Sequence, residues 1–286
     1  MGLEYLIDEA MSAAEAGLKT GCPSIKIVGV GGGGGNSIDR ISRLGNHGYE
    51  TIAFNTDTQA LSQVSAKKKV LFGVSITKGF GCGGDAEMGK RCAEYDIELI
   101  EEAIDGADIL YLTMGLGGGT GTGAGPVIAQ AARKKGMMVI CIASTPFSFE
   151  RARFKRASLA VKQLEEYCHS LILIDNNKLL RVVPDSPMDH GFCVMDQLIT
   201  NVVHGITEAI TKPSMINLDY ADFKTIIMQG GTSTILYGES DASRPDLVVK
   251  EVLGNPLMDI DYKGATGALI HLTGGRKMSL ERIDHI

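Results

Sequence analysis

The sequence predicts an α/β protein in which a parallel sheet, covered by helices on both faces, precedes a long helix and a smaller α/β domain. Short apolar runs alternate with helical segments over the first 176 residues, at 24–30, 49–57, 68–73, 107–114, 137–144 and 170–176. This alternation is typical of a parallel sheet buried on both sides. The pattern then changes to one helix at 189–211 with a broad apolar face, which ends before Pro213.

The intervening segments predict the helices in order. Amphipathic or capped stretches favour helices at 1–20, 36–45, 58–64, 87–104, 126–136 and 149–167. After the long helix come the segments 223–231 and 232–240, a helix at 245–254 and a strand at 267–275. The expected domains are an N-terminal helical extension (1–23), a parallel-sheet domain (24–188), a central helix (189–212) and a C-terminal domain (213–286).

Composition narrows the class of protein. Hydrophobic residues at 44% and charged residues at 22% are ordinary for a globular chain of 286 residues. A net charge of −6 argues against a nucleic-acid binder, and no apolar run reaches the length of a membrane span. The N-terminus carries acids rather than the basic flank of a signal peptide. The six dispersed cysteines form no CxxC pair, which favours reduced thiols in a cytoplasmic protein over zinc or disulfides.

Three glycine-rich turns follow predicted strands: GVGGGGGN at 29–36, GFGCGGD at 79–85 and GLGGGTGTGAGP at 115–126. A glycine-rich turn at a helix N-terminus offers N–H groups and the positive end of the helix dipole, and phosphate is the usual anion there. In a parallel sheet such turns meet at the carboxyl ends of the strands. The sequence therefore predicts a site for a chain of phosphates. The alternative is a flexible surface loop at 115–126, but threonines interleave its glycines at fixed spacing.

The first turn alone leaves another class of function open. Gly29, Gly31 and Gly34 form G-x-G-x-x-G, and Asp57 ends the next strand, as in Rossmann-like dinucleotide-binding domains. A nicotinamide-dependent oxidoreductase would use this turn but has no need of GGGTGTG. The chain has no G-x-x-x-x-G-K-[ST], so it is no ordinary P-loop NTPase. Neutralising the phosphates then requires backbone N–H groups, helix dipoles and a hydrated metal, for which Mg²⁺ is the best candidate.

Five segments resemble, in order and spacing, motifs of the FtsZ members of the tubulin/FtsZ family: KIVGVGGGGGNSIDRI, FNTDTQAL, GLGGGTGTGAGPVIA, TPFSFE and INLDYADFK. The resemblance runs from about residue 24 to 280. It implies a GTPase that polymerises head-to-tail into protofilaments at the division site, and membrane adaptor proteins that bind a C-terminal tail. A GTP-binding switch on the same fold that does not polymerise is the alternative.

The resemblance also implies which residues contact GTP or GDP. They are Gly31, Gly32, Gly33, Asn36, Asn55, Asp57, Gly81, Cys82, Gly83, Gly117, Gly118, Gly119, Thr120, Gly121, Thr122, Gly123, Pro146, Glu150, Arg153, Asn176, Phe192 and Asp196. Phe192 would stack on guanine, and Asp196 would accept hydrogen bonds from its N1–H and amino groups, which adenine does not offer together. Core packing on the long helix is the alternative for Phe192.

The segment NLDYAD carries the candidate catalytic residues. Asp219 and Asp222 lie three residues apart, near Asn217, before a segment expected to be a strand. Carboxylates can position and polarise an attacking water, whereas the plainer interpretation is a helix cap or turn. The resemblance implies that this loop serves the nucleotide of the next subunit.

The chain departs from the family pattern at several positions. Phe154 stands where the family usually has Arg, with Arg153 and Arg156 beside it, and Thr145 stands where Arg is frequent. Cys82 and Gly84 occupy positions where Ala is common. The family continues beyond the strand predicted at 267–275, so the C-terminal domain is expected to be shortened or incomplete. The helix at 1–20 resembles the N-terminal extensions of archaeal members.

Overall fold

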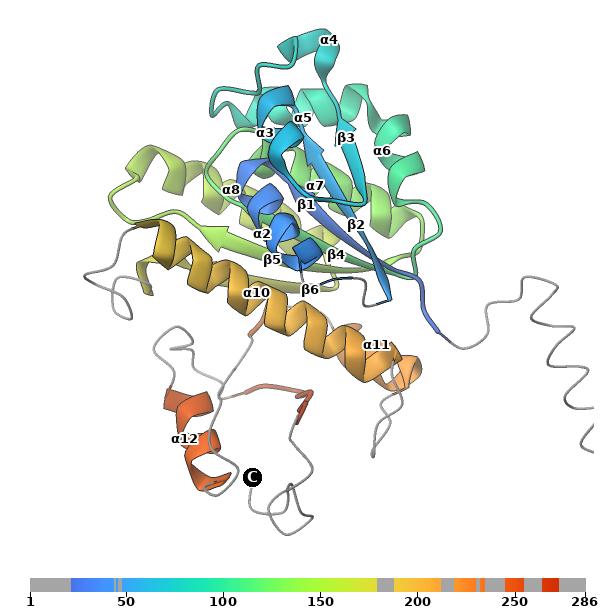
Figure 1. Ribbon diagram of the computed structural model, residues 1–286, viewed down its shortest axis with the longest axis vertical. Coiled ribbons are helices and arrows are strands. Elements are labelled where there is room, and N and C mark those ends of the chain that lie inside the picture. The colour runs from blue at the N-terminus through green and yellow to red at the C-terminus, as the bar shows by residue number, and fades with distance from the viewer. Residues whose placement is uncertain are drawn as a thin grey trace, which may run out of the picture.

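The computed structural model describes residues 22–43, 45, 48–178, 188–211, 219–229, 232–234, 245–254 and 264–272. The helix expected at 1–20, the candidate residue Asn217 and positions 235–240 and 273–275 of the predicted C-terminal segments lie outside these ranges. Within the described residues the predicted α/β class is confirmed, because strands and helices alternate through the sheet (Figure 1).

The sheet has seven strands in the order β3-β2-β1-β4-β5-β6-β7, and every neighbouring pair is parallel. The strands are β1 (Ile25–Val30), β2 (Tyr49–Asn55), β3 (Lys68–Leu71), β4 (Ile109–Gly115), β5 (Met138–Thr145), β6 (Ser170–Asp175) and β7 (Thr232–Ser233). The chain builds outward from β1 in one direction and from β4 in the other. The strand order therefore reverses between β1 and β4, which is where ligands bind in open parallel sheets.

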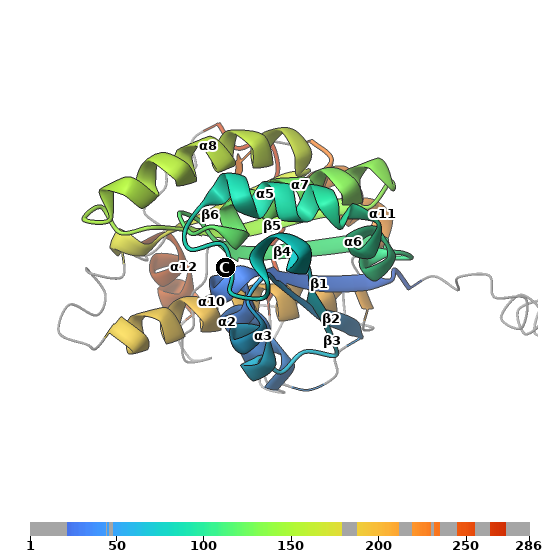
Figure 2. The ribbon, with the colours of Figure 1, turned by 90° about the horizontal axis from the view of Figure 1, so that it is seen from above.

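Helices cover both faces of the sheet (Figure 2). Their bounds are α2 (Gly31–Arg43), α3 (Thr58–Gln63), α4 (Val74–Thr77), α5 (Ala86–Tyr95), α6 (Ile97–Ile104), α7 (Thr120–Lys134), α8 (Arg151–Tyr167), α10 (Met188–Thr211), α11 (Tyr220–Ile227) and α12 (Pro245–Gly254). One face packs against α5, α6, α7 and α8, and the other against α2, α3, α10 and α11.

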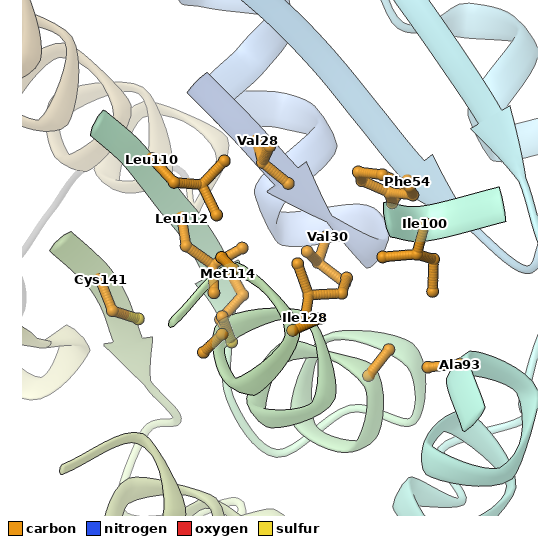
Figure 3. Close-up of a cluster of buried hydrophobic side chains, with 14 of the residues drawn as sticks. Val28, Val30, Phe54, Ala93, Ile100, Leu110, Leu112, Met114, Ile128 and Cys141 are labelled. Carbon is orange, nitrogen blue, oxygen red and sulfur yellow. The ribbon is translucent and has the colours of Figure 1, made fainter. Parts of the chain in front are cut away.

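The core consists of two apolar clusters, one on each face of the sheet. Alternate residues of a strand enter opposite clusters, so Val28 and Val30 of β1 face α7 whereas Ile25 and Ile27 face α2 and α10. Figure 3 shows the first cluster, in which side chains of β1 and β4 meet Ile128 of α7. Strands that are apolar at every position are thus explained by burial on both sides.

Two helices begin earlier than the sequence predicts. The helix predicted to start at residue 36 starts at Gly31 in the structure. The helix predicted to start at residue 126 starts at Thr120. The low helix propensity of glycine argues for turns at both places. The structure instead uses these glycines to bring the two helix starts together, since a Cβ on Gly31 would lie 2.9 Å from the Gly121 nitrogen.

Further expectations need correction. The single helix predicted at 87–104 is broken at Asp96, whose carboxylate accepts a hydrogen bond of 2.6 Å from the Gly73 N–H group. The segment after Asp219, expected to be a strand, is helix α11, held by the buried ring of Phe223. The strand predicted at 267–275 is not formed over residues 267–272, the part of it that the structure describes.

The contact between α5 and α7 yields a stability prediction. A Cβ on Gly123 would overlap the Ala86 carbonyl oxygen and lie 2.6 Å from the Lys90 nitrogen. Gly123→Ala should therefore lower the free energy of unfolding in urea by about 1–3 kcal/mol, although Ala is normally the better helix former. Lys134→Ala, at an exposed position of the same helix, is the control and should change stability by less than about 0.5 kcal/mol. A neutral or stabilising Gly123→Ala would contradict the packing.

Candidate functional site

A cavity of about 300 Å³ lies at the carboxyl edge of the sheet, where the glycine-rich turns meet. Its lining consists of Gly32, Asn55, Asp57, Ala60, Phe80, Gly81, Cys82, Gly83, Gly84, Gly119 and Thr120. All three glycine-rich segments contribute, together with the end of β2. The structure thus brings together segments that are remote in sequence, as the parallel sheet predicts.

The helix N-termini around this cavity are of two kinds. Asp57 caps α3 by accepting from the Ala60 N–H group, and Asp85 caps α5 by accepting from Glu87 and Met88. Helix α7 has Gly119 at its N-cap with no capping side chain, and neither α2 nor α7 has an acid in its first turn. The first N–H groups of a helix have no intrahelical acceptor. The starts of α2 and α7 are therefore the ones suited to an anion.

The glycines of the site have two distinct roles. Some permit close packing of backbones, since a Cβ on Gly33 would lie 2.9 Å from the Gly115 nitrogen and one on Gly119 would lie 2.7 Å from Cys82 Cβ. Gly121 and Gly123 are likewise buried against neighbouring backbone. At Gly32, Gly83 and Gly118, in contrast, a Cβ would meet no atom within 4 Å. These three positions border open space, so a ligand there could approach the backbone itself.

The end of β2 is ordered by side-chain hydrogen bonds. Asn55 Oδ1 accepts from the N–H groups of Thr56 (2.8 Å) and Asp57 (3.2 Å). The buried Thr56 hydroxyl lies 2.8 Å from Thr120 Oγ1 and 3.3 Å from Cys82 Sγ, and its carbonyl accepts from the Gly81 N–H group. Thr56 therefore joins the end of β2 to the second and third glycine-rich turns. Thr56 is not among the site residues predicted from the sequence, although its place between Asn55 and Asp57 could have indicated it.

The segment 145–156 adjoins the third turn. Gly117, at φ 98°, faces Pro146 and Arg153, and its N–H group donates to Thr122 Oγ1 at 2.8 Å. Arg153 forms an ion pair of 2.6 Å with Glu150, and its side chain is 58% exposed. Arg156, which the sequence analysis did not place in the site, donates from Nη1 to the Gly84 carbonyl. The two arginines thus differ, because Arg153 packs against Gly117 whereas Arg156 donates a hydrogen bond to Gly84, a residue of the cavity lining.

Helix α10 places Phe192 and Asp196 one turn apart, next to α2. The Phe192 ring is 38% exposed and lies 6.0 Å from the Phe147 ring, so it is not a core residue. Asp196 accepts a 2.7 Å hydrogen bond from the Ser37 hydroxyl of α2, a contact that the sequence analysis did not find. Burial raises the pKa of Asp196, and the hydrogen bond from Ser37 opposes that rise.

Two polar residues complete this end of the site. Asn176 is buried, and its Oδ1 has no hydrogen-bond partner within the part of the chain that the structure describes. An orphaned buried carbonyl is costly, so a ligand that donates to it would relieve the cost. Asn36 is exposed on the first turns of α2.

The candidate catalytic acids lie elsewhere. Asp219 is the N-cap of α11, and its Oδ1 accepts a 2.7 Å hydrogen bond from the Asp222 N–H group. The helix-cap interpretation of the sequence is therefore confirmed for Asp219. Helix α11 precedes β7 in the chain, and Thr232 of β7 pairs with Leu171 near the start of β6, so α11 lies at the amino ends of the strands. Figure 1 shows α11 at the far end of α10 from Met188. The structure does not bring Asp219 or Asp222 to the cavity of their own chain.

Within the residues that the structure describes, no helix has the length and apolar character that a membrane span requires. The same residues hold no group of three or more His, Cys, Asp or Glu side chains that could bind a metal ion.

Comparison with known proteins assigns the family. The model of the tubulin/FtsZ family GTPase domain matches residues 24–184, and that of the FtsZ family C-terminal domain matches 231–286. Cell division protein FtsZ 2 of Methanocaldococcus jannaschii is 46% identical over 266 residues, which cover 92% of this chain and 70% of the relative. The FtsZ 2 protein of Halobacterium salinarum is 43% identical over 295 residues, covering 99% and 75%.

The solved structures agree. An FtsZ dimer from M. jannaschii, without ligand, superimposes with a TM-score of 0.87 at 39% identity and covers 96% of this chain and 80% of that one. The chain belongs to the tubulin/FtsZ family, whose members are GTPases. Within that family it groups with the FtsZ cell division proteins.

The half-buried carboxyl group of Asp196 gives a prediction about pH. The pKa of Asp196 is raised, so its contribution to stability is complete below the unfolded value of about 3.9 and is lost as the pH rises through the folded value. Asp196→Asn cannot ionise, so without nucleotide its stability relative to wild type should increase between about pH 4 and 7. Urea unfolding at several pH values measures this.

A second variant provides the control for that measurement. Ser37→Ala removes the hydrogen bond that lowers the pKa of Asp196, so the loss of stability should move to higher pH than in wild type. If the stabilities of wild type and Asp196→Asn change in parallel with pH across this range, the pKa of Asp196 is not raised by burial.

Proposed function

We propose that the protein binds and hydrolyses GTP and polymerises head-to-tail as a component of the cell-division ring. The observation that carries this proposal is the cavity beside the starts of α2 and α7, neither of which has an acid in its first turn, together with two acids at the opposite end of the sheet. The first feature suits a chain of phosphates, and the second suits catalysis on a neighbouring molecule.

The nucleotide would lie along the carboxyl edge of the sheet. Its phosphates would occupy the open space beside Gly32, Gly83 and Gly118, where backbone N–H groups can be reached directly. The ribose would lie towards Pro146, Glu150 and Asn176. A ribose hydroxyl could then donate a hydrogen bond to Asn176 Oδ1, which has no partner within the described residues. Guanine would stack on Phe192 and donate to Asp196. The cost of ionising Asp196 in the empty protein would then be offset by two hydrogen bonds.

A Mg²⁺ ion fits this arrangement. Mg²⁺ retains several waters and is usually held by substrate phosphates with one or two carboxylates. Asp57 is a carboxylate on the cavity lining, and the described residues offer no larger cluster of ligands. The ion would therefore be bound mainly by phosphate oxygens and water, and would reduce the negative charge of the phosphates.

Hydrolysis would require a second subunit. Asp219 and Asp222 are exposed on α11, at the amino ends of the strands, whereas the cavity lies at the carboxyl ends. If subunits stack with the same orientation, α11 of one faces the cavity of the next, and Asp222 could position the attacking water. A relative from M. jannaschii is known as an FtsZ dimer. Such heterologous contacts continue into filaments when they do not close into a ring.

Two alternative functions remain distinguishable. A GTP-binding switch that does not polymerise would use the same cavity, but the exposed acids of α11 favour the polymer. A nicotinamide-dependent oxidoreductase receives no support, since the matched family is one of GTPases.

In the cell we expect a cytoplasmic protein at the division site, with membrane adaptor proteins as partners of any C-terminal tail. The domain limits of 24–188, 189–212 and 213–286 are part of this proposal.

The open position at Gly118 gives the test of nucleotide binding. Gly118→Asp should weaken GTP binding more than about a hundredfold, because a like charge beside phosphate costs several kcal/mol. Its fold should be unchanged, since a Cβ there meets no atom within 4 Å. Gly118→Asn has the same shape without the charge and should lose much less affinity. Titration with a fluorescent GTP analogue measures the affinity of each variant, and circular dichroism checks that each is folded. Normal binding by Gly118→Asp would refute the site.

Mixing two inactive variants tests the shared active site. Asp222→Ala should bind GTP and hydrolyse it poorly, whereas Gly118→Asp should bind none but keep its α11 acids. One junction between them is complete, so a mixture should regain a substantial part of the phosphate release that each variant lacks alone. Wild type mixed with each variant shows whether the variants still associate. If they associate and the mixture releases only the sum of the separate rates, catalysis between subunits is wrong.

A further inference from the structure

A buried serine of α2 contacts the carboxylate of α10 to which guanine is proposed to donate. Ser37 is 3% exposed, and its Oγ donates a hydrogen bond of 2.7 Å to Asp196 Oδ1. The two residues are 159 positions apart in the chain, so the contact exists only because α2 packs against α10. Because Ser37 is enclosed by protein, it would act on a ligand only through Asp196.

The Ser37 hydroxyl has two acceptors within reach, and the geometry favours the carboxylate. A buried serine within a helix commonly donates to the carbonyl four residues earlier. For Ser37 that acceptor is the Gly33 carbonyl oxygen, at 3.4 Å, whereas Asp196 Oδ1 lies at 2.7 Å. Hydrogen bonds to a carboxylate are shorter and stronger than those between neutral groups. The hydroxyl proton therefore points to Asp196 rather than to its own helix.

The Asp196 carboxylate depends on this hydrogen bond for its orientation. The terminal torsion of an aspartate is broad, so the side chain alone does not set the direction of its two oxygens. Arg40 of α2 acts on Asp196 through its charge, but its Nη1 donates to Gln197 Oε1 at 3.4 Å. Within the part of the chain that the structure describes, Ser37 is the one hydrogen-bond donor to the Asp196 carboxylate.

We propose that Ser37 determines base specificity by orienting the Asp196 carboxylate, so that both of its oxygens face the N1–H and 2-amino groups of guanine. The inference rests on the proposed function, because it assumes that Asp196 contacts the base. A carboxylate oxygen has two lone pairs, so Oδ1 can accept from Ser37 and from the base together. Ser37 touches no ligand itself and is a positioning residue.

The consequence is a preference that depends on the 2-amino group of the base. Hypoxanthine, the base of inosine diphosphate (IDP), has the N1–H group of guanine and lacks the amino group. An oriented carboxylate therefore loses one of its two hydrogen bonds to IDP, and a site built for a donor discriminates against an analogue without it. Without Ser37 the carboxylate can turn to meet N1–H alone, which both bases offer. Ser37→Ala should therefore weaken GDP binding more than IDP binding.

The experiment measures the displacement of a fluorescent GDP analogue from the full chain by GDP and by IDP. Both competitors are diphosphates, so GTP hydrolysis does not change the ligand during the titration. A hydrogen bond to a charged group supports a preference of the wild type for GDP of about tenfold or more. Ser37→Ala should reduce that preference by about threefold to tenfold.

Two further variants show whether the effect passes through Asp196. Ser42→Ala removes another serine hydroxyl of α2, one that lies 3.1 Å from Thr51 Oγ1, and should leave the preference unchanged. In an Asp196→Ala background, Ser37→Ala should change the preference no further, because the carboxylate that Ser37 orients is absent. Circular dichroism shows whether each variant is folded.

The outcomes separate this inference from the proposed function. An equal loss of affinity for GDP and IDP in Ser37→Ala overturns the inference, since it indicates a general change in packing. An unchanged or larger preference for GDP also overturns it, as does a further effect of Ser37→Ala in the Asp196→Ala background. These outcomes leave the proposed function intact if the wild type prefers GDP. Failure of the wild type to bind the GDP analogue, or to prefer GDP to IDP, would contradict the proposed nucleotide site and the inference with it.

Discussion

The close approach of the α2 and α7 N-termini at the reversal of strand order is the constraint on which the site depends. A Cβ on Gly31 or Gly33 would come within 2.9 Å of the Gly121 or Gly115 backbone nitrogen. Only glycine allows this spacing, and it directs two helix dipoles towards one point. Helix α7 has no capping side chain and neither helix has an acid in its first turn, whereas Asp57 and Asp85 cap α3 and α5.

The glycines of the turns have two different roles, which explains why the turns contain so many glycine residues. Buried glycines such as Gly119 and Gly123 allow backbones to pack, and a larger residue there would alter the fold. Glycines that face open space, such as Gly32 and Gly118, can take a side chain without a clash, so a substitution there would affect the approach of a ligand and not the fold. One glycine-rich sequence therefore encodes both the packing of α7 and the floor of the cavity, and the two functions are separable by substitution.

The opposed ends of the molecule give the proposed assembly its direction. A parallel sheet places all its glycine-rich turns at one edge, and the long helix α10 carries the chain from that edge to the other. In the proposed arrangement, acids placed at the far end would remain away from phosphates bound to the same chain, which would avoid repulsion between like charges. Asp196, in contrast, is half-buried beside α2, where burial raises its pKa and the Ser37 hydroxyl donates a hydrogen bond to it.

The sequence by itself determined the class of fold, the alternation of strands and helices from β1 to β6, and the edge at which a ligand would lie. These follow from the alternation of apolar runs and from glycine at strand ends, which are local properties. Tertiary structure alone decided that α2 and α7 begin within the glycines, because packing against a neighbouring helix overrides local propensity. It also decided the contacts of Thr56, Ser37 and Arg156, since each joins residues far apart in the chain. No local pattern records such a contact, so it is visible only once the chain has folded.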